Sequence, residues 1–157
     1  MSSSMQCYCG KPLAFESCCE ALISGRQGAE SPEALMRSRF SAYVIQNYDY
    51  ILATYALAQR IELSLNELRQ SSATTKWLRL VVQKTVQNNT SGKVEFSAYY
   101  QLDGQVYLMH ETSDFIFDNK QWYYTTGLIH KDSGHYTQQR NDMCLCGSGK
   151  KFKKCCA

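Results

Sequence analysis

The hydrophobic pattern in the middle of the chain changes from a helical period to a strand period near residue 76. Before that point, one set of apolar positions recurs at the spacing of a helix face: Leu35, Met36, Phe40, Tyr43 and Val44. Ser31 is placed to cap this helix, with Pro32 in the first helical position and Glu33 beside the positive end of the helix dipole. The spacing therefore predicts a helix that begins at Pro32 and extends to about residue 44.

Two shorter helices are expected between this helix and the first strand. Asp49 can start a second helix that carries Ile51, Leu52 and Tyr55. The sequence SLNE at 64–67 is a capping box, in which the serine side chain bonds a backbone N–H three residues further on. A short third helix is therefore predicted to begin there.

From Lys76 onward, β-branched and aromatic residues alternate with polar residues between turn signals. This pattern predicts strands at 76–86, 93–102, 105–117 and 121–129. The connections are short, and Asp103-Gly104 is a strong signal for a two-residue hairpin turn. Because sequential strands with short turns pair with their neighbours, we expect an antiparallel meander packed on the helices, which is an α+β domain over 26–139.

The third predicted strand carries most of the candidate chemistry of this domain. His110, Thr112 and Asp114 share one face of it, and Glu111, Ser113 and Phe115 share the other. His110 with Asp114 could form an acid–base pair, but the plainer interpretation is one solvated face and one face packed on the core. No nucleophile, glycine-rich loop or second acid is placed nearby by the sequence, so we expect a protein that is not an enzyme.

Two arginines on the first helix add to this candidate pocket. Arg37 and Arg39 can each pair with Glu111 in a buried structural link, because a buried charge requires a partner. Alternatively, they line an anion-binding pocket. The predicted pocket residues are therefore Arg37, Arg39, His110, Glu111 and Asp114.

Composition places the protein among ordinary globular domains. Its 157 residues are 44% hydrophobic and 20% charged, and the net charge of +3 is too small to imply nucleic-acid binding by the chain as a whole. The N-terminal segment has no apolar core of a signal peptide, and no apolar run is long enough to span a membrane. We therefore expect a cytoplasmic protein, and in that reducing compartment a dense set of cysteines indicates metal binding or catalysis.

All eight cysteines of the chain lie in two short segments near its ends. CYCGKPLAFESCC (7–19) and CLCGSGKKFKKCC (144–156) both have the spacing C-x-C-x8-C-C, with Gly10 and Gly147 after the second cysteine. Phe15 and Phe152 also fall at the same offset. Chance would rarely reproduce this spacing, so the two segments are an internal repeat.

The spacing suits a tetrahedral zinc ion. Zinc takes four nitrogen or sulfur ligands, commonly as two pairs joined by a turn, and a glycine lets the backbone bend back around the ion. An adjacent Cys-Cys pair is an unusual half of such a site. Small disulfide loops and an iron–sulfur cluster remain alternatives, whereas a catalytic thiol is disfavoured because neither segment contains a histidine. A site closed by four cysteines would be structural.

The C-terminal segment resembles the SEC-C zinc motif at the end of the preprotein translocase motor SecA. There, all four positions bind zinc, which implies Cys144, Cys146, Cys155 and Cys156 as ligands, with cysteine in the place of the final histidine of SecA. The N-terminal segment departs from the motif in its GKPLAFES sequence, yet it implies a second zinc ion on Cys7, Cys9, Cys18 and Cys19.

The resemblance extends over nearly the whole chain. A SEC-C motif at each end, together with LMRSRFSAYV (35–44), TKWLRLVV (75–82), QWYYTTG (121–127) and RND (140–142), is similar to the bacterial YchJ family. That resemblance implies an NTF2-like cone, with N-terminal helices on a curved sheet. It divides the chain into an N-terminal zinc module (1–25), the α+β domain (26–139) and a C-terminal zinc module (140–157).

Charge distinguishes the two predicted modules. A zinc ion with four thiolates carries −2, and the second module adds Lys150, Lys151, Lys153 and Lys154 for about +2 overall. In the first module, Lys11 and Glu16 cancel, which leaves about −2. We expect the lysines to contact an acidic partner, although they could serve solubility alone. The motif of SecA contacts the chaperone SecB and ribosomes, which suggests a similar partner, and nucleic-acid binding is a further alternative.

Overall fold

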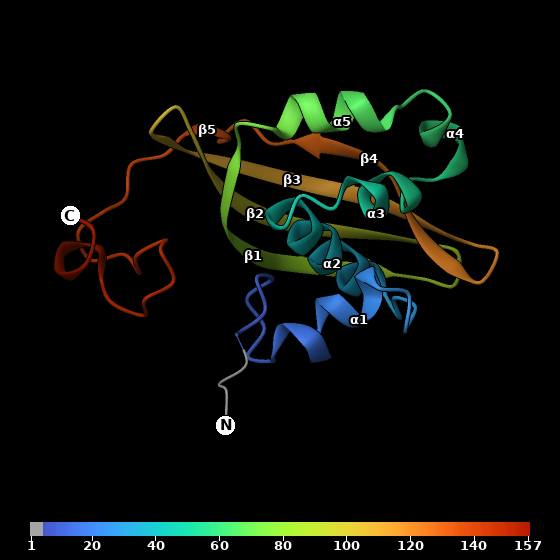
Figure 1. The fold of residues 1–157 in the computed structure, drawn as a ribbon, viewed down its shortest axis with the longest axis horizontal. Coiled ribbons are helices and arrows are strands. Elements are labelled where there is room, and N and C mark those ends of the chain that lie inside the picture. Colours follow the sequence, from blue (N-terminus) through green and yellow to red (C-terminus); the bar gives the residue numbers. More distant parts are fainter. Residues whose placement is uncertain (1–4) are drawn as a thin grey trace.

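A curved antiparallel sheet forms one layer of the structure, and helices cover its concave face (Figure 1). The computed structural model describes residues 5–157, so residues 1–4 of the predicted N-terminal module lie outside the described residues. The four long strands pair in sequence order: β1 (Lys76–Gln87), β2 (Ser91–Leu102), β3 (Gln105–Asp118) and β4 (Gln121–Ile129). The predicted meander is confirmed, and the α+β class with it.

Backbone geometry explains why the hairpins form where the sequence indicated turns. Asp103 and Gly104 both have positive φ, at 52° and 79°. Asn119 and Lys120 share this geometry between β3 and β4, at 50° and 67°. Two consecutive positive φ values are the signature of the turn whose twist matches paired strands. A fifth strand, β5 (Gly134–His135), pairs with β3 and was not predicted, because two residues carry no hydrophobic period.

Three predicted helices are present, with corrections to one of them. In α2 (Pro32–Val44) the side chain of Ser31 accepts from the Ala34 N–H at 3.0 Å, and in α5 (Leu65–Ser72) Ser64 accepts from Glu67 at 3.1 Å. Two details of α3 (Tyr48–Ala53) were predicted wrongly: its start at Asp49, and the inclusion of Tyr55, which lies beyond its end. Asn47 is the cap instead, since its side chain accepts from the Tyr50 N–H at 3.1 Å.

Several short elements carry too few residues for a period to be recognised. They are the helices α1 (Cys19–Ile23) and α4 (Leu57–Arg60), and the single 3-10 turns η1 (Phe15–Ser17) and η2 (Phe152–Lys154). Within residues 5–157, no helix has both the length and the apolar character needed to cross a membrane.

The main core lies between α2 and the sheet. Leu35, Met36 and Phe40 of α2 pack against buried residues of all four long strands, including Leu80, Val94, Phe96, Ala98, Phe115 and Trp122. Three cysteines of the N-terminal segment, Cys7, Cys9 and Cys19, belong to this same cluster. The N-terminal module is therefore continuous with the core of the domain.

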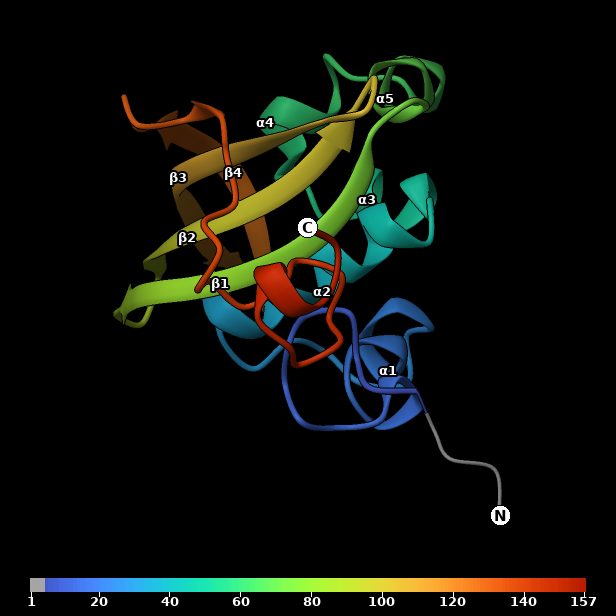
Figure 2. The same cartoon turned by 90° about the vertical axis from the view of Figure 1, so that its left-hand side faces the viewer.

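Both cysteine segments, 7–19 and 144–156, lie on the β1 side of the sheet. The N-terminal segment packs below β1 and α2, and the C-terminal segment lies in front of β1 (Figure 2). Residues of both segments line one groove together with Leu78, Arg79 and Leu80 of β1. The fold thus brings the two copies of the repeat, which are far apart in the sequence, to neighbouring positions.

Candidate functional site

The two cysteine segments have the same backbone, as the repeat in the sequence implied. Their backbone hydrogen bonds recur at the offset that separates Cys7 from Cys144. The equivalent pairs are Cys7 N–H to Leu13 O and Cys144 N–H to Lys150 O, both 2.8 Å; Gly10 N–H to Cys7 O and Gly147 N–H to Cys144 O, both 3.2 Å; and Cys18 N–H to Phe15 O and Cys155 N–H to Phe152 O, both 3.1 Å.

A glycine in each segment allows the backbone turn that follows the first pair of cysteines. Gly10 and Gly147 have φ values of +94° and +85°, a conformation that residues with a Cβ rarely adopt. At Gly10, an added Cβ would also come within 3.4 Å of the Leu80 carbonyl oxygen of β1. The reversal lets η1 and η2 return the second pair of cysteines to the first pair.

The sulfur atoms of each segment converge on one point. In both clusters, one Sγ from each of the four cysteines lies within 4.8 Å of all the others. Cys9 and Cys18 are 3.7 Å apart, as are Cys155 and Cys156, and Cys146 and Cys155 are 3.3 Å apart. A disulfide would need about 2.05 Å, whereas a tetrahedral ion with Zn–S bonds of about 2.3 Å separates its ligands by about 3.8 Å. The eight free thiols therefore form two clusters that can each hold a metal ion.

Without a cation, four thiols at these distances cannot all ionise. Burial, then the charge of Cys9, raises the pKa of Cys18 to about 12. In the other cluster, hydrogen bonds from Ser148 and then Cys155 lower the pKa of Cys146 to about 6, while sharing its proton with Cys144 raises the pKa of Cys156 to about 12. A divalent cation would stabilise the remaining thiolates, so the electrostatics of the donor set also fit a metal ion.

The N-terminal cluster is buried. Cys7, Cys9 and Cys19 are 4%, 0% and 1% exposed. Arg37 of α2 fixes the cluster to the helix, because its guanidinium donates to the Cys9 carbonyl at 2.8 Å and also pairs with Glu33 at 2.8 Å. This module is therefore in contact with α2 through Arg37 and with β1 through the backbone of Gly10.

The C-terminal cluster is open to solvent, although its backbone is the same. Cys144 is buried at 2% exposure, but Cys146, Cys155 and Cys156 are exposed. One contact between the domain and this module is polar: the Tyr136 hydroxyl donates to the Asp142 carboxylate at 3.2 Å. All four lysines of the motif are exposed, and none forms an ion pair with any residue in 5–157: Lys150, Lys151, Lys153 and Lys154.

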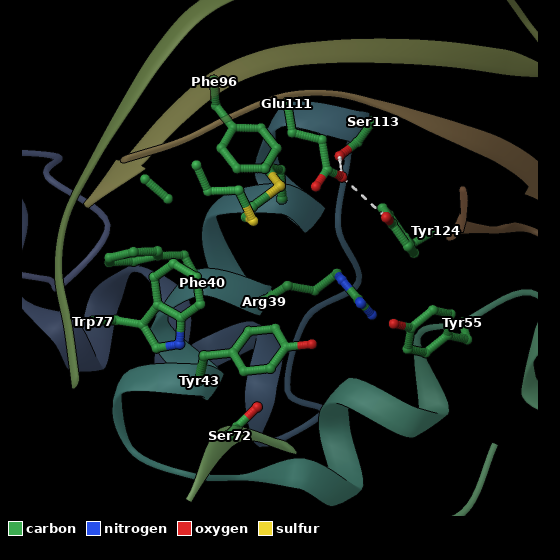
Figure 3. A pocket seen from close by; sticks show the side chains of 13 residues that line it. Arg39, Phe40, Tyr43, Tyr55, Ser72, Trp77, Phe96, Glu111, Ser113 and Tyr124 are labelled. Carbon is green, nitrogen blue, oxygen red and sulfur yellow. Dashed lines mark hydrogen bonds between the residues drawn. The ribbon is translucent and has the colours of Figure 1, made fainter. Parts of the chain in front are cut away.

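A cavity of about 250 Å³ lies between α2 and the sheet (Figure 3). Aromatic side chains form much of its wall, and Arg39 and Glu111 provide its charges. The Arg39 guanidinium donates to the Ile51 carbonyl at 3.0 Å and to the Thr54 hydroxyl, and it lies 4.6 Å from the ring centres of both Tyr55 and Tyr124. Arg39 is therefore satisfied by carbonyl, hydroxyl and ring contacts rather than by a carboxylate.

Glu111 is held on the other side of the same cavity. Its carboxylate accepts from Ser113 at 2.7 Å and from the Tyr124 hydroxyl at 3.0 Å. Burial, and then the charge of Glu111, raises the pKa of Tyr124, so this hydroxyl stays protonated and donates. The indole N–H of Trp77, which also lines the cavity, is buried without a hydrogen-bond partner among the described residues.

The structure brings together only part of the predicted pocket. Arg39 and Glu111 line the cavity, but they form no ion pair with each other, and Arg37 points to the N-terminal module instead. His110 and Asp114 lie on the opposite face of the sheet. Asp114 pairs with Lys93 there, and His110 contacts Glu95 and Asp132, so His110 and Asp114 do not form a pair with each other.

Three aromatic residues that line the cavity were not predicted from the sequence to belong to a pocket: Tyr55, Trp77 and Tyr124. The strand period offered a partial signal, because alternation in β4 places Trp122 and Tyr124 on the buried face. No local signal places Tyr55, which lies between two short helices and reaches β4 through a single bridge to Tyr124.

Comparison with known proteins assigns most of the chain to described families. The model of the YchJ middle NTF2-like domain matches residues 31–127, and that of the SEC-C motif matches residues 140–157. A UPF0225 protein of Shewanella sp. (strain ANA-3) is 41% identical over 99% of this chain and 98% of its own length. A UPF0225 protein of Vibrio cholerae is 36% identical over 97% of this chain and 99% of its own length.

Solved structures agree with this assignment. A SEC-C motif containing protein from Rhodopseudomonas palustris has a TM-score of 0.77 at 32% identity, and covers 81% of this chain and 100% of its own. One from Psychrobacter arcticus has a TM-score of 0.70 at 28% identity, and covers 98% of this chain and 95% of its own. The expected NTF2-like fold is thus confirmed, and the chain belongs to the UPF0225, or YchJ, family of SEC-C motif proteins.

Proposed function

We propose that this chain is a cytoplasmic zinc-binding protein that acts by contact rather than by catalysis. Its two clusters would each bind one zinc ion, and the C-terminal module would dock on an acidic surface of a protein or of the ribosome. The supporting observation is the difference between two modules of equal backbone: one is buried in the core, while the other exposes its cysteines and four lysines.

The choice of zinc rests on the donor set. Four thiolates in a tetrahedral arrangement are ligands of zinc or of iron–sulfur clusters. The clusters have room for a single ion rather than for a larger inorganic core, since the sulfur atoms lie within 4.8 Å of one another. Four cysteines fill all coordination positions of each ion, so the ion would be structural. It would hold the backbone turn of the module in place.

Exposure and charge support the proposal that the C-terminal module binds an acidic partner. The N-terminal copy has the same ligand spacing with only Lys11 and Glu16 as charged residues, so metal binding does not require a lysine surplus. In the C-terminal copy, four unpaired lysines surround an exposed site. A rigid cationic surface of this kind favours an acidic partner, because opposite potentials speed encounter and fix orientation.

Charge reversal tests this proposal directly. All four C-terminal lysines are changed to glutamate, and binding to purified bacterial ribosomes and to the acidic chaperone SecB is measured by co-sedimentation and titration calorimetry. A matched control reverses four exposed lysines on other parts of the surface: Lys76, Lys84, Lys120 and Lys131. We expect loss of binding in the first variant only.

Two results would contradict the proposal. Equal binding by the C-terminal variant and the wild type would remove the argument from charge. Equal loss of binding in both variants would show that binding depends on the net charge of the protein rather than on this module. Binding to naked RNA with a steep dependence on salt would instead favour the nucleic-acid alternative.

A second function is favoured by the cavity, which we propose binds a small, partly aromatic carboxylate. A carboxylate would accept from the unpartnered Trp77 indole N–H and approach the Arg39 guanidinium, and an aromatic body would match the walls of the 250 Å³ space. Under this proposal, the cysteine modules serve only to stabilise the two ends of the fold.

The indole N–H signals in an NMR spectrum provide a built-in test of this second function. The chain contains two tryptophans, Trp77 at the cavity and Trp122 beside Phe117, so two signals are expected. Benzoate should shift the Trp77 signal and leave that of Trp122 unchanged, and Trp77→Phe identifies which signal is which. No shift with benzoate, or equal shifts of both signals, would contradict a carboxylate site in this cavity.

A further inference from the structure

A cluster of two histidines and a carboxylate lies on the face of the sheet opposite to the buried side chains of Phe96 and Glu111. Glu95 comes from β2, His110 from β3, and His130 directly follows β4. One ligand atom of each lies within 4.8 Å of the other two. The cluster is separate from both cysteine modules, and it faces away from the cavity under α2.

The hydrogen-bond partners of His110 resemble those of histidines that bind metal ions. Its Nε2 lies 2.7 Å from the Glu95 carboxylate, and its Nδ1 lies 2.7 Å from the Asp132 carboxylate. A carboxylate on the second ring nitrogen is the usual partner of a metal-binding histidine, since it fixes the orientation of the ring. The side chain of His110 is only 15% exposed, so the ring has little freedom to turn away.

The second histidine is positioned by the backbone. Its ring stacks on that of His110, with centroids 4.0 Å apart and planes at 12°. The His130 N–H donates to the His110 carbonyl at 2.8 Å, and the Ser133 hydroxyl links the same turn to the backbone of His110 at 2.9 and 3.1 Å. The turn that carries His130 and Asp132 is therefore fixed before any ion arrives.

We propose that Glu95, His110 and His130 bind one divalent first-row transition-metal ion, with Asp132 as the residue that orients His110. Ligands on such an ion lie about 3 Å or more apart when the bonds are about 2.1 Å, so the His110–Glu95 contact opens by a few tenths of an ångström. His130 exchanges its contact with the Thr112 hydroxyl, now 2.7 Å, for the ion.

Ligand chemistry sets the class of ion. Two imidazoles and one carboxylate suit iron, cobalt, nickel or zinc better than calcium or magnesium, which prefer oxygen ligands alone. Three protein ligands do not complete the coordination of such an ion, so the remaining positions face solvent. This site differs in kind from the two cysteine clusters, because it leaves positions open to water or to a small ligand.

Cobalt titration of the whole chain tests this assignment. The protein carries no histidine tag, its two cysteine clusters are first filled with zinc at two ions per chain, and Co²⁺ is then added. We expect one further Co²⁺ per chain, whose visible spectrum lacks the thiolate-to-cobalt charge-transfer band. Glu95→Gln and His130→Gln should each weaken this binding by about tenfold or more. His135→Gln, at an exposed histidine hydrogen-bonded to Gln105, should leave it unchanged.

Absence of cobalt binding beyond the cysteine sites would overturn the proposal, as would equal affinity in all three variants. Paramagnetic broadening in the wild-type protein gives a second readout that does not depend on how the variants fold. The chain has three histidines, and Co²⁺ should broaden the ring signals of His110 and His130 while sparing His135. Broadening of His135 to the same extent would contradict the site.

Discussion

Equivalent cysteines of the two modules should differ strongly in their effect on stability. Cys9 is fully buried in the core cluster with Leu35, Phe40 and Leu80, whereas its counterpart Cys146 is exposed. Cys9→Ser and Cys146→Ser therefore make the same chemical change in the same backbone. They differ only in what surrounds the module.

The expected magnitudes follow from these surroundings. A serine at Cys9 leaves a buried hydroxyl that costs about 1–3 kcal/mol, and it also removes one sulfur from the proposed metal site, which is continuous with the core. Loss of a structural metal is among the few single changes that exceed about 4 kcal/mol, so we expect a loss of at least that much. For Cys146→Ser, the stability of the central domain should change by less than about 0.5 kcal/mol.

Urea unfolding followed by tryptophan fluorescence measures this difference. Both tryptophans, Trp77 and Trp122, lie in the sheet, so the signal reports the central domain alone. With a slope of about 2 kcal/mol per molar urea, Cys9→Ser should lower the midpoint by about 2 M. Equal midpoints for the two variants, or a larger loss for Cys146→Ser, would refute the assignment of a structural role to the N-terminal module.

Three further predictions concern other parts of the fold. Gly127→Ala should lower the free energy of unfolding by about 2–4 kcal/mol. The added Cβ would lie 2.0 Å from the Glu111 carboxylate and push it away from its donors, Ser113 and Tyr124. An unchanged urea midpoint would contradict that packing. Chelator should remove metal in two phases, the faster from the exposed C-terminal site, and Cys146→Ser should lack the fast phase in a stopped-flow experiment; a single phase in the wild type would contradict the difference in exposure. Ser31→Ala should cost about 1 kcal/mol in thermal or urea unfolding through loss of the cap of α2, and a change below about 0.3 kcal/mol would show that this cap contributes little.

The strands and the repeat could be predicted because each has a local pattern. Alternation along β3 correctly separated Glu111 and Ser113, which are buried, from His110 and Asp114 on the other face. The equal spacing of the cysteines predicted two equal backbones, and the hydrogen bonds of Cys7 and Cys144 confirm this prediction. Serine caps at Ser31 and Ser64 marked two helix starts for the same reason, since a cap involves residues only three positions apart.

The features that could not be predicted depend on contacts between residues that are distant in the sequence. The ligand spacing of the two modules is identical, so it could not indicate that one is buried and the other exposed. His110 finds its partners on β2 and in the turn after β4, and no periodicity points to Asp132. The predicted links of Arg37 and Arg39 to Glu111 did not form. Arg37 pairs with Glu33 of its own helix and with the Cys9 carbonyl, and Arg39 donates to the Ile51 carbonyl and the Thr54 hydroxyl.

Native mass spectrometry of the intact chain, purified without added metal, tests the central claim most directly. Two zinc ions per chain are expected at the cysteine clusters, with one lost in Cys9→Ser and the other lost in Cys146→Ser. A metal-free chain whose mass is lowered by the hydrogens of disulfide formation would contradict the account, because the eight thiols would then be paired with each other.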